Sequence, residues 1–290
     1  IGEVFRNPGL ATTYAAIARG GRDAYYRGSI ARKIVAFSEA NGGYFTMPDF
    51  EDHTSEWVEP VTTNYRGYDV WELPPNSQGI VALMMLNILE GYDIASMGHN
   101  TADTLHLLTE AKKLAFADRD TFVADPSANS LPVAELISKS YGEARRALID
   151  PTHAREASPG NPWEHSETVY LTVVDQDRNA VSLIESIFGN FGSRIVPGDL
   201  GFAIQNRGSG FSLEEGHLNS LEPHKRSLHT NMPGFLTKQG RPLMPFGVMG
   251  GHMQPQGHVQ VLINMIDFGM NVQEAGDAAR IRHGETLLVE

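Results

Sequence analysis

The sequence predicts an α+β protein in which strands and helices come in blocks, with sheets packed in layers and helices outside. Three observations lead to this prediction. Apolar residues recur at helical spacing through most of 8–148, apart from one stretch with a period of two. From residue 168 onward the chain is rich in strand-like segments of β-branched and aromatic residues. Between these halves, 150–165 holds three prolines, several charges and few apolar residues, which is typical of an exposed loop or linker.

The first half is expected to be mainly helical. Pro8 near the start and Gly20-Gly21 at the end delimit the first helix, and Asn41-Gly42-Gly43 ends the second. The expected helices span 8–21, 22–40, 47–53, 78–89 and 101–123, with one or two more inside 131–148. Alternating residues at 58–63 and 65–73 predict a pair of strands with a turn near Asn64 or Gly67.

The second half opens with a predicted hairpin over 168–187, whose strands meet at the polar turn 175–179. A glycine-rich loop at 189–201 and an irregular polar region at 207–230 follow it. The remaining expected elements are strands at 201–205, 234–238 and 243–248 and helices at 256–268 and 272–281.

The composition excludes several classes of protein. With 290 residues, 41% of them hydrophobic, the chain can bury a substantial core as one large domain or two small ones. The formal net charge of −12 and the lack of a long Lys/Arg run argue against a nucleic-acid partner. Apolar runs such as 80–89 are far too short for a membrane span, so no membrane partner is expected.

The termini and the cysteine count leave the compartment open. Without cysteine, disulfides, thiolate metal sites and cysteine nucleophiles are all excluded. No signal peptide is visible, but the chain opens on Ile1 rather than Met, so we expect upstream sequence to be missing. A cytoplasmic location and a periplasmic or secreted one are therefore both compatible with the sequence.

Common motifs of other chemistries are absent: there is no GxSxG elbow, Walker loop, dinucleotide fingerprint or HExxH. Neither a metal nor a cofactor is expected. Five histidines could be considered for a metal cluster, but their spacing fits no pair of ligands on a helix face, so we expect solvated loop residues. They are His217, His224, His229, His252 and His258. The carboxylates of 110–125 are likewise expected on a solvated helix face and in a cap.

Thr168 is the unusual residue of the predicted hairpin, because it opens an otherwise apolar strand. A threonine hydroxyl is a poor nucleophile unless a base lies beside it, and its own α-amino group can be that base. Such an amine titrates near about 8, close enough to neutrality to accept a proton. This requires that the Glu167–Thr168 bond be broken. From the residues alone, a structural strand threonine is the stronger interpretation.

Nine collinear segments carry a resemblance to a known family. They are RDAYYRGSIARKIV (22–35), NYRGYDVWELPPNSQG (64–79), LNILEGYDI (86–94), AKKLAFADRDTFVADP (111–126), TVYLTVVDQDRNAVS (168–182), FGS (191–193), VPGDLGF (196–202), HKRSLHTNMP (224–233) and VMGGHMQPQGHVQVLINMIDFGMN (248–271). Together they resemble the γ-glutamyltranspeptidase family of N-terminal-nucleophile (Ntn) hydrolases. The variant pattern is similar to the cephalosporin-acylase-like and oxamate-amidohydrolase-like members of that family.

The resemblance implies a four-layer αββα sandwich, made as a precursor that cuts itself before Thr168. Residues 1–167 would then be the large-subunit portion and 168–290 the small-subunit portion, forming one composite domain. Members of the family usually run longer, so an N-terminal part of the large subunit is expected to be absent here. The implied partners are a small-molecule amide and the two subunits of one precursor, with no cofactor, and a homo-oligomer stays open.

The resemblance also implies a mechanism. Thr168 attacks an amide carbonyl with its freed amine as base, and water or an acceptor amine resolves the acyl-enzyme. Gly250 and Gly251 match the glycines whose N–H groups hold the developing oxyanion. Ser186 matches a second hydroxyl that hydrogen-bonds the amine of the nucleophile. Without the family, the glycine pair would be read as a turn and Ser186 as an ordinary strand serine.

The departures from the γ-glutamyl enzymes concern the substrate. Phe188 replaces an asparagine that binds the substrate carboxylate, and Gly210 stands where an acid holds the α-amino group. His229 and Thr230 replace a pair of serines. We predict that Arg207 pairs with a substrate carboxylate and disfavours an ammonium group. The alternative is a surface arginine in a salt bridge.

Three functions are therefore weighed. The first is a self-processing amidohydrolase or acylase whose γ-glutamyl specificity is in doubt. The second is a true γ-glutamyl transpeptidase acting on glutathione, against which the lost carboxylate and amine contacts count. The third is a non-catalytic binding module on the same fold, against which the presence of Thr168, Ser186 and the glycine pair counts.

Overall fold

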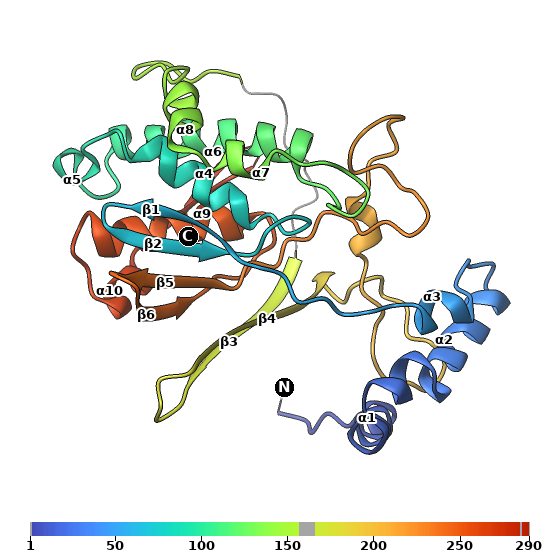
Figure 1. Cartoon of the computed structure of the whole chain (residues 1–290). Coiled ribbons are helices and arrows are strands. Elements are labelled where there is room, and N and C mark those ends of the chain that lie inside the picture. Colours follow the sequence, from blue (N-terminus) through green and yellow to red (C-terminus); the bar gives the residue numbers. More distant parts are fainter. Residues whose placement is uncertain (1, 157–165, 285, 290) are drawn as a thin grey trace. The chain divides into compact units, whose positions relative to one another are not determined.

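The computed structural model describes residues 2–156, 166–284 and 286–289, and the chain forms two compact units (Figure 1). The first unit is Ile1–Trp57 with Gly189–Asn206, and the second is Val58–Phe188 with Arg207–Glu290. All the site residues that the sequence singles out belong to the second unit. Most of the predicted loop at 150–165 lies outside the described residues, at 157–165. No described helix combines the length and the apolar composition needed to cross a bilayer.

Helices form most of the first unit: α1 at Pro8–Tyr26, α2 at Ser29–Ala40 and α3 at Met47–Glu51. The predicted end at Gly20-Gly21 is a kink, because Gly21 leaves the helical conformation (φ 58°, ψ −148°) and α1 continues beyond it. The prediction of one helix over 22–40 is wrong. The helix is interrupted at Gly28, where a Cβ would lie 2.4 Å from the carbonyl oxygen of Ala24. Ile30, Ile34 and Leu200 form the buried core of this unit.

The loop 190–206, in which every residue is described, contains no strand. The strand predicted at 201–205 is therefore wrong. Gly201 has a φ of +76°. Ile204 bonds to the neighbouring turn, since its N–H donates to the Ile195 carbonyl (2.9 Å) and its own carbonyl accepts from the Ser193 N–H (2.7 Å). With its hydrogen bonds made locally, the segment does not join a sheet.

The second unit contains an antiparallel sheet of order β1-β2-β5-β6. Its strands are β1 Val61–Tyr65, β2 Tyr68–Glu72, β5 Gly234–Lys238 and β6 Arg241–Phe246. The predicted turn is confirmed at Arg66 and Gly67, whose φ angles of 50° and 85° suit a tight hairpin. Pairing of Trp71 with Phe235 joins segments far apart in the chain. A smaller pair of strands, β7 Ile281–His283 and β8 Leu287–Val289, lies near the C-terminus.

The predicted hairpin over 168–187 is confirmed as β3 Ser166–Val174 and β4 Ala180–Gly189. One face packs on the larger sheet: the Ser182 hydroxyl donates to the Gly234 carbonyl (3.0 Å), and the Tyr170 ring leaves no room for a Cβ at Gly247. The other face carries exposed apolar side chains, namely Val169, Leu171, Val173, Val181, Leu183 and Ile187. Burial alternates along β4, which is the pattern of a strand covered on one side.

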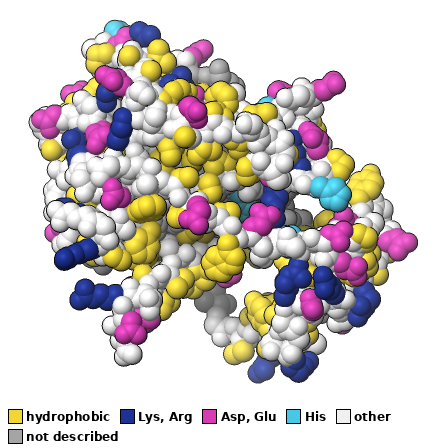
Figure 2. Space-filling view, in the orientation of Figure 1, with side chains coloured by type: hydrophobic (Ala, Val, Ile, Leu, Met, Phe, Trp, Pro, Cys, Tyr) yellow, Lys and Arg dark blue, Asp and Glu magenta, His cyan; other side chains and the backbone are white. Residues whose placement is uncertain are grey.

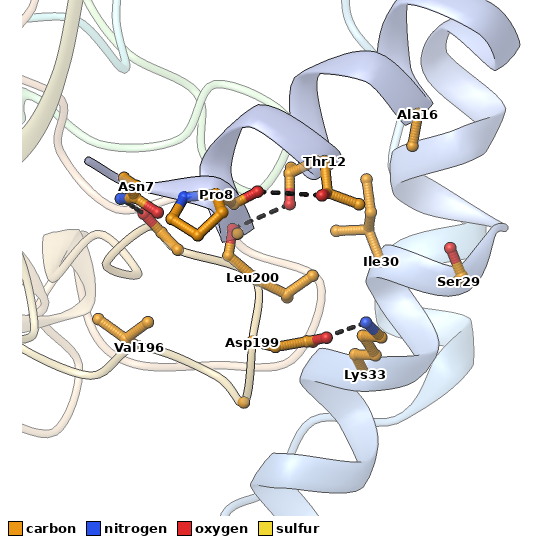
Figure 3. Close-up of a pocket in the computed structure, with 14 residues that line it drawn as sticks. Asn7, Pro8, Thr12, Ala16, Ser29, Ile30, Lys33, Val196, Asp199 and Leu200 are labelled. Atoms are coloured by element: carbon orange, nitrogen blue, oxygen red, sulfur yellow. Dashed lines mark hydrogen bonds and ion pairs between the residues drawn. The ribbon is translucent and has the colours of Figure 1, made fainter.

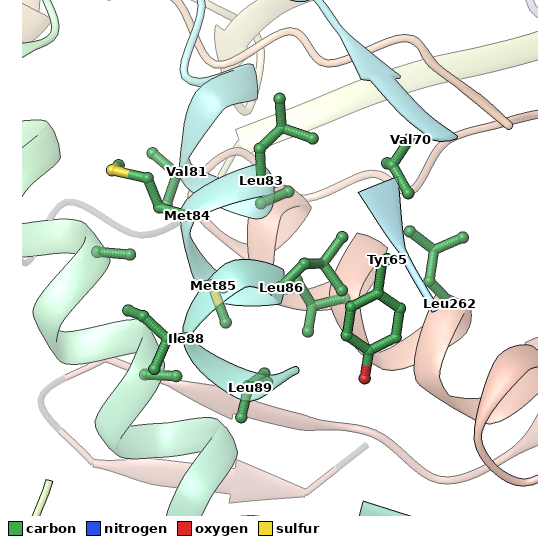
Figure 4. Close-up of a cluster of buried hydrophobic side chains, with 14 of the residues drawn as sticks. Tyr65, Val70, Val81, Leu83, Met84, Met85, Leu86, Ile88, Leu89 and Leu262 are labelled. Atoms are coloured by element: carbon green, nitrogen blue, oxygen red, sulfur yellow. The ribbon is translucent and has the colours of Figure 1, made fainter. Parts of the chain in front are cut away.

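Helix α4 (Gly79–Leu89) is the centre of the main core, and every one of its residues is buried. Its side chains point to all sides, toward Tyr65 and Val70 of the sheet and Leu262 of α9 (Figure 4). A helix that is apolar all round must be enclosed, which explains the unbroken run at 80–89. The surrounding helices are α5 Ile94–Met97, α6 Ala102–Phe122, α7 Val133–Leu136, α8 Lys139–Arg146, α9 Met253–Ile266 and α10 Val272–Asp277.

Two sequence predictions about this unit are wrong for the same reason. The helix predicted at 272–281 stops at Asp277, because the Gln260 side chain holds both the N–H and the carbonyl of Ile281 (2.8 and 2.9 Å) in β7. Of the carboxylates of 110–125, Glu110, Asp118 and Asp125 are buried rather than solvated, and Asp118 pairs with Arg145 at 3.0 Å. In both cases a distant polar partner overrides the local pattern.

On the face drawn in Figure 2, acidic and basic side chains are interspersed.

Candidate active site

Thr168 lies on β3, and its hydroxyl is buried without a hydrogen bond to any described residue. A buried polar group without a partner lowers stability by about 1–3 kcal/mol, so most such groups are bonded. A purely structural threonine would be expected to use its hydroxyl. The environment of Thr168 therefore suits a group reserved for chemistry better than a packing role.

Ser186 lies on β4, on the same face of the hairpin as Thr168. The Asp175 N–H donates to the Asn179 carbonyl (3.0 Å), which pairs these residues across the turn. Thr168 and Ser186 are equally distant from this pair along their strands, so regular antiparallel pairing places them opposite each other. The hydroxyl of Ser186 also accepts the Phe188 N–H (2.8 Å), where the chain turns at a φ of +74°.

Arg207 begins the short 3₁₀ helix η1 (Arg207–Gly210), and only 8% of it is exposed. The surface-arginine alternative is therefore wrong. Its guanidinium donates to the Thr230 hydroxyl (3.1 Å) and to the Asn231 side-chain oxygen (3.0 Å), and it lies 5.4 Å from the centre of the Phe188 ring. Burial lowers the pKa of Arg207 to about 10, so the group keeps its charge at neutral pH.

His229 and Thr230 lie in an extended segment that pairs with the loop before α4. The His229 N–H donates to the Asn76 carbonyl (2.8 Å), and the His229 carbonyl accepts from the Gln78 N–H (2.9 Å). The ring nitrogen Nδ1 accepts the Asn231 N–H (3.2 Å). Burial, and then the charge of Arg207, lower the pKa of His229 to about 4, so its imidazole is neutral at pH 7.

Gly250 and Gly251 form the turn that leads into α9, and their φ angles are +110° and +57°. These conformations favour glycine, which fits the turn interpretation and the close approach of a substrate equally. Their carbonyls accept the first N–H groups of the helix, from Met253 (3.0 Å) and Gln254 (3.1 Å). The start of a helix also favours negative charge nearby.

The sequence prediction missed three site residues: Gln78, Arg119 and His252. Gln78 is fully buried, and its Nε2 donates to the carbonyls of Gly251 (2.9 Å) and Thr230 (3.2 Å). Arg119 donates to the Gln78 side-chain oxygen (3.3 Å) and to His252 Nδ1 (2.9 Å). All three lie within segments that resemble the family, but a single sequence gives no local signal for their contacts.

Phe188 lies between Arg207 and His252, and its ring contacts both side chains. Its ring meets the His252 ring edge-on, with centroids 6.4 Å apart, and it also stacks with Arg207. The structure thus brings together Ser186, Phe188, Arg207 and Thr230, and it joins them to the glycine pair through Gln78.

The prediction of solvated loop histidines is wrong for three of the five. His258 is fully buried on α9, and its Nδ1 lies 2.6 Å from a carboxylate oxygen of Glu72. Its Nε2 accepts the Val248 N–H (3.4 Å), just before the glycine pair. His229 and His252 are largely enclosed and contribute to the site network. No group of three metal-binding side chains occurs among the residues that the structure describes.

A separate cavity of about 460 Å³ lies in the first unit, between α1, α2 and the loop around Asp199 (Figure 3). Lys33 and Asp199 form an ion pair of 2.6 Å on its wall. The buried Thr13 hydroxyl donates to the Leu200 carbonyl (2.9 Å). The predicted site residues do not line this cavity.

Comparisons with known proteins agree with this picture. The Gamma-glutamyltranspeptidase family model matches residues 1–289. The chain is 42% identical over 289 residues to the "Glutathione hydrolase-like YwrD proenzyme" of Bacillus subtilis, covering 98% of this chain and 54% of the relative. It is 37% identical over 305 residues to the "Acylase ACY 1 proenzyme" of a Pseudomonas species, covering 97% and 54%.

The fold resembles the crystal structure of cephalosporin acylase from Bacillus halodurans, with a TM-score of 0.92 and 47% identity over all of this chain and 53% of the other. The mixed α/β fold and the predicted resemblance to acylases are thereby confirmed. The chain spans about half the length of the curated relatives it matches. The chain belongs to the γ-glutamyltranspeptidase family.

Proposed function

We propose that the whole protein is a self-processing Ntn amidohydrolase or acylase with Thr168 as its nucleophile. The observation that carries this proposal is the buried Thr168 hydroxyl, which bonds to no described residue and faces Ser186 across the hairpin. Relatives named as proenzymes support the processing step. Neither a metal nor a cofactor takes part in the proposed reaction.

Processing hydrolyses the Glu167–Thr168 bond, so that water adds across it and leaves a carboxylate on Glu167 and a free amine on Thr168. In turnover, the amine takes the proton from Oγ1 as this oxygen attacks the amide carbonyl. Collapse of the tetrahedral intermediate expels the amine product with that proton and leaves an ester on Thr168. Water or an acceptor amine then attacks the ester and releases the acyl group. Ser186 hydrogen-bonds the free amine of Thr168, and the N–H groups of Gly250 and Gly251 hold the oxyanion.

The subunit arrangement belongs to the same proposal. Residues 1–167 form the large-subunit portion and 168–290 the small-subunit portion, and both contribute to one composite αββα sandwich of four layers. The likeness to cephalosporin acylase supports this arrangement. We assign the two central layers of this sandwich to two groups of strands, the β1-β2-β5-β6 sheet and the β3–β4 hairpin.

The substrate is proposed to be an amide of an acid that carries a second carboxylate. Arg207 binds that carboxylate, Phe188 packs on the acyl chain, and Thr230 and the neutral His229 lie beside them. A buried cation repels a substrate ammonium group, and Gly210 offers no acid to hold one. These features favour a glutaryl-type acyl group over a γ-glutamyl group.

Glutathione hydrolysis is the second candidate, because one relative is named glutathione hydrolase-like. Turnover of glutaryl, γ-glutamyl and oxamate-type amides by the full-length protein separates the two. We expect a higher kcat/KM for the glutaryl amide and no turnover by Thr168→Ala. A preference for the γ-glutamyl amide would favour the second candidate, and an active Thr168→Ala would refute the nucleophile.

A further inference from the structure

The side chain of Gln78 is a buried bridge between the glycine pair and the segment that carries Thr230. We infer that Gln78 is a positioning residue for catalysis, which holds the Gly250–Gly251 turn in the conformation that binds the oxyanion. The inference rests on the proposed role of that turn. The proposed mechanism does not use Gln78 or the arginine behind it.

The orientation of the Gln78 amide follows from its neighbours. Its nitrogen lies 2.9 Å from the Gly251 carbonyl and 3.2 Å from the Thr230 carbonyl, and both groups can only accept hydrogen bonds. Its oxygen lies 3.3 Å from a nitrogen of Arg119, which can only donate. A flipped amide would place donor against donor and acceptor against acceptor. The amide is therefore held in one orientation, with both of its N–H bonds used.

Glycine-rich turns need such a restraint. Gly250 and Gly251 lie at φ values of +110° and +57°, and glycine moves easily between several backbone conformations. The bond from Gln78 fixes the Gly251 carbonyl and with it the Gly251–His252 peptide plane, which restrains the backbone rotation of Gly251 within the turn. Donors aimed at an oxyanion must be held in place before the reaction, because reorganisation during the reaction lowers the rate.

Arg119 fixes Gln78 in turn. Its guanidinium is 2% exposed, pairs with Asp120 at 2.6 Å and stacks 4.1 Å from the centre of the Phe116 ring. It also donates to His252 Nδ1 (2.9 Å), the residue directly after the glycine pair. Arg119 of helix α6 thus supports the turn at two points, through Gln78 and through His252.

The test compares Gln78→Met and Gln78→Glu with Gln260→Met in the full-length protein. Methionine keeps the length without the donors, and glutamate keeps an acceptor for Arg119 but loses the donors toward both carbonyls. Gln260 is a matched control, because its buried amide also donates to two carbonyls, those of Gln256 (3.0 Å) and Ile281 (2.9 Å). All rates are expressed per Thr168 N-terminus, so that incomplete processing does not count as lost catalysis.

We expect both Gln78 variants to lose about 10- to 100-fold in kcat with KM changed by less than about 3-fold, since deleting an oxyanion donor outright costs about 100- to 1000-fold. Affinity for a boronate that forms a tetrahedral adduct on Thr168 should fall in parallel. Gln260→Met should lower Tm and leave kcat unchanged.

Two results would overturn the inference. The first is a wild-type kcat in Gln78→Met. The second is a lower kcat accompanied by a raised KM and a lowered Tm in both Gln78 variants, which would indicate a purely structural role. If Gln78→Met does not fold, the isosteric Gln78→Glu is read by the same criteria. An active Thr168→Ala would instead refute the proposed function, so the two failures are distinguishable.

Discussion

Replacing Arg207 tests the proposed specificity most sharply. The guanidinium is buried, with 8% of the residue exposed, so a substrate carboxylate that reaches it would lose its water. Removing one partner of such a buried charged pair costs about 2–5 kcal/mol. This corresponds to a loss of affinity of about 30- to 5000-fold. We therefore expect Arg207→Ala to raise KM for a glutaryl amide by at least about 30-fold.

The matched neutral substrate is a butyryl amide, which lacks the second carboxylate. Arg207 also holds Thr230 and Asn231, so its loss can disturb the site for both substrates. The ratio of the two KM values isolates the charge contact from this general effect. Arg207→Lys should restore part of the ratio, because lysine keeps the charge but not the planar, forked donor. An equal KM change for both substrates would refute the reasoning, and the exposed Arg241→Ala should change neither.

Three further predictions concern stability and the turn. His258→Ala should reduce the free energy of unfolding by about 3–5 kcal/mol, measured by urea titration, because it leaves the buried Glu72 side chain without its partner. Little change in this free energy would contradict the prediction. The double replacement Glu72→Met/His258→Leu should restore stability. Folding lowers the pKa of His229 to about 4, so the unfolded chain binds more protons than the folded one between about pH 6.5 and 4, and stability should fall as pH drops through that window. The fall in Tm over this window should be smaller for His229→Gln. A pH profile of Tm identical to that of the wild type would contradict the account. Gly250→Ala should lower kcat by about 100-fold, because the φ of +110° at Gly250 strains any other residue and a Cβ there would lie 3.1 Å from the Met253 side chain. A kcat equal to that of the wild type would exclude this turn from the site.

The sequence predicts those parts of the fold that depend on local patterns. Helix α6 begins after Thr101 as expected, because the threonine side chain accepts the Thr104 N–H, and the hairpin follows from strand residues around a polar turn. Polar contacts between distant segments are not encoded in such patterns. Glu72 and His258 are 186 residues apart, so neither position indicates that the other will be its hydrogen-bond partner.

The same distinction applies to the site. Thr168, Ser186 and the glycine pair are recognisable because their residue types match the family motif. Gln78 contacts Gly251 from 173 residues away, and its role depends on which way its amide points, which only the fold determines. The burial of Arg207 is similarly invisible in its polar, glycine-rich surroundings, where a surface position is the natural expectation.

Intact-mass analysis of the full-length precursor tests the central claim most directly. The account predicts two fragments, the smaller of which begins at Thr168, and a single uncut chain for Thr168→Ala. It further predicts that amide turnover appears only with the fragment that begins at Thr168. A wild-type chain that stays uncut and still turns over amides, or a cut at another residue, would contradict the account.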